Sequence, residues 1–275
     1  MKIFQNNSIY HYIILYVLGA IATLANAPFS IYPLIFALGF GIYLINFTPS
    51  ILKTFISGWF LGFGWFSLGL YWIGSAFIVA ETYTIFLMPI AVLLLPSLLA
   101  VFWGGACVCA KLINKNKNFF IINIIICLSL FEYLRAKIFT GFPWLMPSMI
   151  FSSNEYLIQI FSFIGSFSTN LVVLTVSTLP LILLSNFNGK YTLSFLLLIP
   201  ISILFFSGIF RYNNKDLLQS NNQLITIVQP NIKQKNKWDL KKRDQHLNKL
   251  VMLSTNDKVD FMNKSNIVIW PETSF

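Results

Sequence analysis

Residues 54–78 read TFISGWFLGFGWFSLGLYWIGSAFI and contain no charged side chain. A helix of about 20 apolar residues crosses the hydrocarbon core of a bilayer, so this stretch predicts a membrane span. Small residues such as Gly58 and Gly62 recur at three- and four-residue spacing, which lets helices approach closely. The aromatic side chains of the stretch are predicted either to pack between helices or to line a lipid-facing cavity.

Six further apolar stretches predict a polytopic α-helical membrane bundle of about seven helices. The other candidate spans are 9–26, 30–47, 84–110, 119–134, 157–184 and 191–210. Of the 275 residues, 56% are hydrophobic and 10% are charged, and the mean hydropathy is +0.72. Soluble domains carry about 25% charged residues, so a soluble globular protein, a disordered chain and a disulfide-rich module are excluded. Because further spans follow at once, the first span is expected to be an uncleaved helix and not a secretory signal.

The net charge of +10 is unevenly distributed. Residues 1–210 hold eight of the nineteen basic residues and three of the nine acids, and residues 211–275 hold the others. The distribution of Lys and Arg over the short loops places the N-terminus in the cytoplasm. Seven spans then deliver residues 211–275 to the opposite side, which is the periplasm if the membrane is a bacterial inner membrane. No basic stripe interleaves with exposed aromatic residues, so nucleic-acid binding is not predicted.

The three cysteines lie in apolar stretches, at Cys107, Cys109 and Cys127. None has histidines at metal-site spacing, so small buried side chains are the favoured interpretation. No metal and no cofactor is expected.

The polar tail predicts the beginning of a second domain. Residues 224–231 and 266–270 are predicted as buried strands, and residues 237–254 between them as a helix. The apolar residues of this helix are Trp238, Leu247, Leu250, Val251 and Met252. This strand–helix–strand order is typical of an α/β fold, so we divide the chain into a bundle over 1–210 and an incomplete α/β domain over 211–275. The basic run between residues 233 and 243 is predicted to be a solvated face or a surface attracted to anionic headgroups.

One carboxylate is a candidate for catalysis. Glu272 follows Trp270 and Pro271, just beyond the carboxyl end of the second predicted strand, where sites form in open α/β sheets. Partial desolvation against these neighbours suits a general base. A solvated loop residue is the alternative.

Residues 131–148 read FEYLRAKIFTGFPWLMPS and place charges next to the membrane. Charges at membrane depth are usually functional or paired. Glu132 and Arg135 are predicted either to take part in function or to neutralise each other as an i,i+3 pair at the end of a helix.

Several segments together resemble the apolipoprotein N-acyltransferase family. The segments, in chain order, are NAPF at 26–29, YWI at 71–73, EYLR at 132–135, TGFPWL at 140–145, VQPNI at 228–232, KW at 237–238 and IWPET at 269–273. The resemblance implies a membrane bundle of eight helices joined to a periplasmic carbon–nitrogen-hydrolase (nitrilase-like) domain.

The resemblance also implies an activity and a set of site residues. In the family a cysteine thiolate takes an acyl chain from a phospholipid such as phosphatidylethanolamine. The acyl group then passes to the N-terminal cysteine amine of a diacylglyceryl apolipoprotein. Glu272 matches the family's general base, and Trp238 matches a tryptophan that handles substrate. Trp144 and Arg135 are expected to bind substrate.

The resemblance ends before the family's catalytic lysine, nucleophilic cysteine and last helix, which lie beyond the position of Phe275. Cys107 and Cys109 adjoin Lys111 at the predicted cytoplasmic end of a span, on the face opposite Glu272. They cannot replace the nucleophile, so this polypeptide is expected to be inactive alone. A non-catalytic remnant or half of a split enzyme is the alternative. A polytopic transporter is disfavoured because the spans contain few ionisable residues and no paired repeat.

Overall fold

The computed structural model describes residues 9–79, 84–114, 119–138, 141–184, 189–214, 225–237, 239–254 and 267–271. The chain forms two compact units, which we describe separately. The first comprises Met1–Gly74 and Leu87–Asn214, and the second comprises Ser75–Phe86 and Lys215–Phe275.

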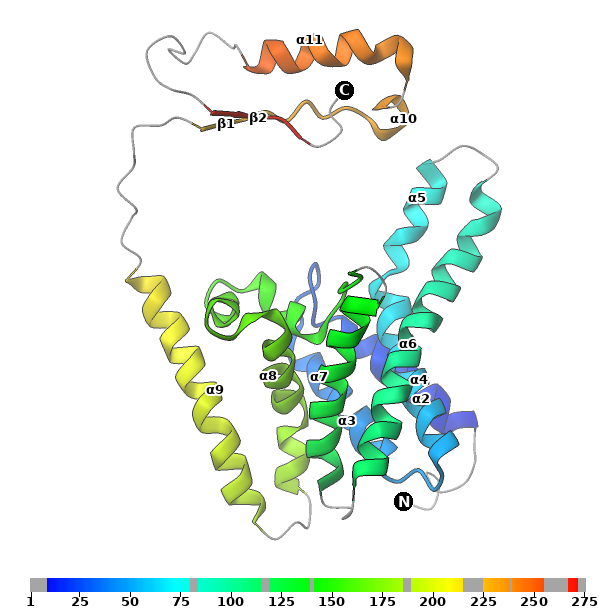
Figure 1. Cartoon of the computed structure of the whole chain (residues 1–275), viewed down its shortest axis with the longest axis vertical. Helices are drawn as coiled ribbons and strands as arrows, with labels where there is room; N and C mark the ends of the chain where they lie inside the picture. Colours follow the sequence, from blue (N-terminus) through cyan, green and yellow to red (C-terminus); the bar gives the residue numbers. More distant parts are fainter. Residues whose placement is uncertain are drawn as a thin grey trace. The chain divides into compact units, whose positions relative to one another are not determined.

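The first unit is a bundle of α-helices joined by loops and 3-10 turns (Figure 1). Its helices are α2 (Ile9–Thr23), α3 (Ile35–Ile45), α4 (Ile51–Gly69), α6 (Met88–Ile113), α7 (Phe120–Ile138), α8 (Ile160–Leu184) and α9 (Lys190–Asn213). Its 3-10 turns are η1 (Tyr32–Leu34), η2 (Tyr71–Ile73), η5 (Pro147–Ser153) and η6 (Leu157–Gln159). The short helix α5 (Gly74–Val79) and the turn η3 (Thr84–Leu87) lie mostly in the second unit.

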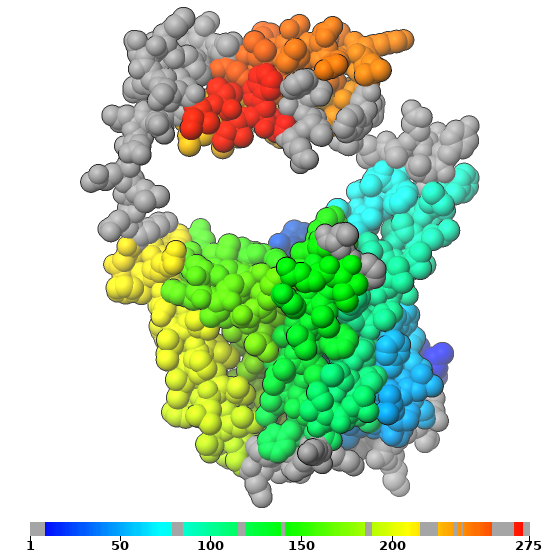
Figure 2. All heavy atoms as spheres, viewed as in Figure 1, coloured from blue at the N-terminus to red at the C-terminus, as the bar shows by residue number. Residues whose placement is uncertain are grey.

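Within the described ranges, four helical segments are long and apolar enough to cross a membrane. They are Ile51–Gly69, Ile85–Ile113, Leu157–Leu184 and Lys190–Asn213, and two shorter apolar helices cover Ile9–Thr23 and Tyr32–Ile45. Helix α9 exposes large apolar side chains such as Phe195, Ile203 and Phe206 along its length, and it forms one flank of the bundle in Figure 2. The structure thus supports a helical membrane part, and the number of seven spans stays a prediction.

Helix α4 packs between α2 and α6. A Cβ atom at Gly64 would clash with the Tyr16 carbonyl of α2, and one at Gly62 would lie 2.9 Å from Cβ of Trp103 on α6. The predicted role of the glycines in close helix packing is therefore confirmed at these two positions. Trp65 and Phe66 are fully buried between helices, so these two aromatic residues do not line a lipid-facing cavity.

The predicted third span, roughly 54–78, begins close to the observed helix but extends past its end. Helix α4 begins at Ile51, because the Ser50 hydroxyl caps it by accepting a hydrogen bond of 3.3 Å from the backbone N–H of Lys53. It ends at Gly69, and Leu70 leaves the helical conformation with φ −111° and ψ 10°. The side chain of Leu145, from a distant loop, packs directly on Gly69. The contact between Leu145 and Gly69 therefore lies at the end of α4, which the hydrophobicity of the sequence alone does not reveal.

The predicted fifth span, 119–134, is too short by about one turn. Helix α7 continues to Ile138 and includes Glu132, Arg135 and Lys137. The charged side chains do not end the helix because two of them are paired in the interior of the bundle, as described below.

The second unit contains a parallel strand pair, β1 (Ile225–Ile227) and β2 (Ile267–Ile269), in the register Ile225 to Ile267 and Ile227 to Ile269. Between the strands lie α10 (Gln234–Lys237), η7 (Leu240–Lys242) and α11 (Arg243–Ser254). Helix α11 runs alongside the strand pair (Figure 1). The predicted strand–helix–strand order is therefore present. Its assignment to a nitrilase-like domain stays a prediction.

Two details of the tail differ from the prediction. The long helix begins at Arg243 and not at Lys237, because Asp239 starts a separate turn by accepting a 3.1 Å hydrogen bond from the N–H of Lys241. The strands were predicted to be buried, but Ile225 and Ile227 are 56% and 77% exposed. A two-stranded sheet with one neighbouring helix is too narrow to cover both of its faces.

The helix α11 buries fewer of its apolar residues than expected. Leu250 is fully buried and His246 is nearly so, whereas Val251 and Met252 are exposed. One narrow stripe of the helix is therefore covered within this unit.

Candidate active site

The four predicted site residues fall into two groups. Arg135 and Trp144 belong to the described part of the first unit, where α7 leads into the loop 141–146. Trp238 and Glu272 lie outside the described residues. We therefore build the site from the bundle and treat the tail separately.

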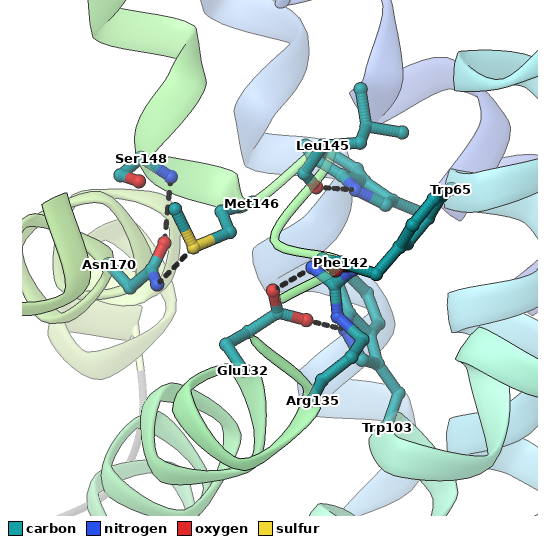
Figure 3. A network of polar contacts seen from close by, with 9 residues as sticks. All are labelled: Trp65, Trp103, Glu132, Arg135, Phe142, Leu145, Met146, Ser148 and Asn170. Atoms are coloured by element: carbon teal, nitrogen blue, oxygen red, sulfur yellow. Dashed lines mark hydrogen bonds and ion pairs between the residues drawn. The ribbon is translucent and has the colours of Figure 1, made fainter. Parts of the chain in front are cut away.

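A buried ion pair lies on α7. Glu132 and Arg135 both have fully buried side chains, and the Arg135 guanidinium forms an ion pair with the Glu132 carboxylate. The indole N–H of Trp103 on α6 donates a 2.7 Å hydrogen bond to the other carboxylate oxygen (Figure 3). The carboxylate is thus bound from two helices, which offsets the large desolvation penalty of a buried charge.

Arg135 also binds the loop that follows its own helix. Its Nη1 group donates a 2.8 Å hydrogen bond to the carbonyl oxygen of Phe142. The guanidinium lies 5.0 Å from the ring centroid of Phe66 on α4, in cation–π geometry. Arg135 therefore connects α7, α4 and the loop from inside the protein. It has no exposed surface through which to contact a substrate directly.

Three further contacts hold the loop at the end of the bundle. The indole N–H of Trp65 donates to the Leu145 carbonyl at 2.9 Å. The backbone N–H of Ser148 donates to Oδ1 of Asn170 on α8 at 2.8 Å, and Nδ2 of Asn170 lies 3.9 Å from the sulfur of Met146. As Figure 3 shows, these bonds come from different helices and converge on one short loop.

The backbone of the loop is itself unusual. Gly141 and Leu145 have φ values of 91° and 56°, in the left-handed region. A leucine rarely adopts this conformation, because its Cβ crowds the backbone. The hydrogen bond from Trp65 and the contact of Leu145 with Gly69 hold it there. Strain held by surrounding structure is typical of functional segments.

Two rings of the loop and one ring of η2 stack together, and we call the group formed by Trp72, Phe142 and Trp144 the aromatic ledge. The Trp144 ring stacks on Trp72 with centroids 5.3 Å apart and on Phe142 with centroids 4.7 Å apart. Trp72 and Trp144 remain 49% and 45% exposed. Indole rings combine a large apolar face with an N–H donor, which suits them to the interface between lipid and water.

The sequence predicts Trp144 and Arg135 as substrate contacts, which stays a prediction, but it did not point to the residues that position them. Trp103 and Asn170 lie in apolar helices far along the chain from the loop. Asn170 was detectable in principle, since an amide inside an apolar span needs a hydrogen-bond partner.

The tail is described up to Pro271, one residue before the candidate base. The indole N–H of Trp270 donates a 2.9 Å hydrogen bond to the hydroxyl of Ser254 at the end of α11. The backbone N–H of Val228, just after β1, donates to the carbonyl of Ile269 at 3.0 Å. The segment leading to Glu272 is thus fixed to both neighbouring elements.

Potential metal ligands do not gather among the described residues: no three His, Cys, Asp or Glu side chains lie together. Cys107 and Cys127 are buried in α6 and α7, and Cys109 is half-buried in α6.

The chain is similar to known proteins along most of its length. Residues 18–179 match the family model described as the apolipoprotein N-acyltransferase N-terminal domain. Proteins named apolipoprotein N-acyltransferase are similar to it: that of Rhodopseudomonas palustris is 28% identical over 94% of this chain, that of Brucella suis 29% over 93%, and that of Rickettsia prowazekii 28% over 95%.

These matches cover 50%, 50% and 52% of the three relatives, so the chain spans about half the length of the curated relatives that it matches. The family model covers α3, α4, α6 and α7, the loop 141–146 and most of α8. The chain therefore belongs to the apolipoprotein N-acyltransferase family, and it contains that family's N-terminal domain.

Proposed function

We propose that the protein takes part in N-acylation of lipoproteins in a bacterial inner membrane, with its N-terminus in the cytoplasm and residues 211–275 in the periplasm. The observation that carries the proposal is the family match over residues 18–179, which contains the whole network around the loop 141–146. The exposed aromatic ledge supports it, because both proposed substrates are amphipathic lipids.

The proposed reaction has two steps and uses no cofactor. A cysteine thiolate attacks an acyl ester carbonyl of a phospholipid such as phosphatidylethanolamine, and the lysophospholipid alkoxide leaves as it takes a proton. The α-amine of a diacylglyceryl-cysteine apolipoprotein then attacks the thioester, loses a proton to the base, and releases the thiolate. Splitting the transfer in this way is nucleophilic catalysis.

We assign the residues of this chain to parts of that reaction. Glu272 is proposed as the general base, and Trp238 and Trp144 as substrate contacts. Arg135 is proposed as a positioning residue, since it is buried and holds the loop that carries Trp144. The family's nucleophile and its oxyanion-binding lysine have no counterpart within residues 1–275. We therefore expect this segment alone to form no thioester.

A chimaera tests the assignment. Residues 1–275 replace the matching half of the Rickettsia prowazekii relative, and N-acylation of a diacylglyceryl-cysteine peptide is measured with an alkyne-labelled phospholipid. We expect acylation by the chimaera and a loss of at least about 100-fold in Glu272→Gln, since removing a general base costs roughly 10²–10⁴-fold. Asp244→Asn is the matched control, because Asp244 is an exposed acid on α11.

The purified segment 1–275 forms the second arm of the test. We expect it to accumulate no hydroxylamine-sensitive acyl label. Lipid-dependent labelling of the segment alone, or full activity of Glu272→Gln in the chimaera, would contradict the proposed roles.

A further inference from the structure

A cavity in the bundle has no part in the proposed reaction. It has a volume of about 250 Å³ and lies between η1 and the start of α3, the turns η5 and η6, and the middle of α8. Its walls are apolar and include Tyr32, Phe36, Ile150, Phe151, Leu157 and Val176. An apolar cavity of this kind favours a hydrocarbon occupant.

A cluster of hydroxyl groups adjoins the cavity through Tyr32. The Tyr32 ring is part of the wall, and its OH group lies 3.0 Å from Oγ of Ser153. The hydroxyl of Ser30 donates a 3.0 Å hydrogen bond to the same Ser153 oxygen. Tyr32 thus belongs both to the apolar wall and to the hydroxyl cluster. An apolar cavity next to polar groups suits an amphipathic ligand, which has an apolar and a polar part.

The surface around the cavity is apolar, and it includes a candidate membrane helix. Helix α8, which forms one wall, belongs to the candidate membrane segment Leu157–Leu184. Phe36 on the opposite wall is 44% exposed, and Ile158 next to Leu157 is 40% exposed. In a membrane these apolar side chains face lipid, so acyl chains reach the cavity directly from the bilayer.

The charges near the hydroxyl cluster favour a neutral ester over a carboxylate. Glu155, two residues beyond Ser153, is an exposed acid at the turn before η6 and accepts a hydrogen bond from Tyr212. The cluster itself contains only hydroxyl groups and no cation to pair with a fatty-acid carboxylate, whereas the ester oxygens of a glycerophospholipid can accept hydrogen bonds from hydroxyl groups.

We infer that the cavity between α3 and α8 binds one acyl chain of a bilayer phospholipid, with the glycerol ester region at the hydroxyls of Tyr32, Ser30 and Ser153. The inference depends on the membrane location of the bundle and not on acyl transfer. Failure of either proposal leaves the other standing.

The test uses the chain 1–275 in nanodiscs of phosphatidylcholine with a small fraction of a phosphatidylcholine that carries a diazirine on one acyl chain. After irradiation, labelled peptides are quantified by mass spectrometry. We expect the label to concentrate on peptides containing Phe36 and Ile150–Phe151. We expect Val176→Trp, which fills the cavity, to reduce this label at least about fivefold. Leu171→Trp is the matched control, because Leu171 is 39% exposed on the same helix and does not line the cavity.

A double variant keeps the test decisive if Val176→Trp disturbs folding. It combines Tyr32→Phe with Ser153→Ala, which leaves the cavity volume nearly unchanged and removes two hydroxyl groups. We expect a loss of label of roughly fivefold, the effect of about one net hydrogen bond. Label spread evenly over the lipid-facing helices, with both variants like the parent, would overturn the inference. Preferential labelling by a diazirine fatty acid, or crosslinks to a second protein chain at these residues, would also overturn it.

Discussion

Replacement of Arg135 by methionine probes the buried pair on α7 most directly. Methionine has a similar length and keeps most of the apolar contact, but it removes the ion pair with Glu132 and the hydrogen bond to the Phe142 carbonyl. The Glu132 carboxylate then retains the Trp103 indole while it stays fully buried. We therefore expect an uncompensated charge to dominate the effect.

The size of the effect follows from this burial. Removing one partner of a buried ion pair destabilises a protein by about 3–5 kcal/mol. Each 1.4 kcal/mol is a tenfold change in an equilibrium constant, so the equilibrium constant for folding falls by roughly two orders of magnitude or more. Lys137→Met is the control on the same helix. Lys137 is exposed, with its ammonium group 5.6 Å from the Tyr133 ring centroid, and we expect a loss of about 1 kcal/mol or less.

The assay is the free energy of unfolding in mixed micelles, followed by tryptophan fluorescence, for Arg135→Met, Glu132→Leu and the double variant. Because the double variant leaves no unpaired charge, we expect it to be more stable than the sum of the single losses predicts, by about 1–3 kcal/mol. Limited proteolysis in the same micelles reports the loop 141–146. We expect faster cleavage there in Arg135→Met than in Lys137→Met.

Two results would refute the reasoning. Additive losses in the cycle would mean that the two side chains do not stabilise each other. Unchanged proteolysis of the loop would mean that the pair only neutralises itself at the end of α7, which is the simpler of the two interpretations that the sequence allows.

Three further predictions concern the packing, the loop and the topology. Gly64→Ala places a methyl group against the Tyr16 carbonyl of α2, so its melting temperature should fall well below that of Gly74→Ala, where the added methyl meets only the side chains of Met88 and Val92. Equal melting temperatures would contradict the packing. Trp65→Phe keeps an aromatic ring but removes the hydrogen bond to Leu145 and leaves a small cavity, so it should lower the free energy of unfolding by about 1 kcal/mol or more and speed cleavage of the loop 141–146. Unchanged cleavage would show that Leu145 is held by other contacts. An alkaline phosphatase fusion at residue 221 should be active in bacteria, and a fusion at residue 115 should be inactive. The distribution of Lys and Arg predicts opposite sides of the membrane for these two positions. An inactive fusion at residue 221 would exclude a periplasmic tail.

Hydrophobicity was a reliable guide to where helices form, because a run of apolar residues in lipid has few alternatives to a helix. The stretches around α6, α8 and α9 were located to within a few residues on that basis. The motif EYLR and the segment TGFPWL likewise pointed to the region of Arg135 and Trp144. Periodicity also located the strand–helix–strand order of the tail, although the start of α11 and the burial of the strands were predicted wrongly.

The helix ends, the roles of the side chains and the cavity could be determined only from the folded structure. Arg135 was expected to bind substrate, but its position inside the bundle depends on Trp103, Phe66 and the Phe142 carbonyl, which come from three other segments. The order of apolar residues in the sequence decided that the chain forms an apolar helical bundle, because a long apolar run in lipid must satisfy its backbone hydrogen bonds within a helix. Packing in the folded chain decided which loop is held, which charge is paired and where a cavity forms. Hydrogen bonds and steric fit depend on atoms that are brought together from distant parts of the chain.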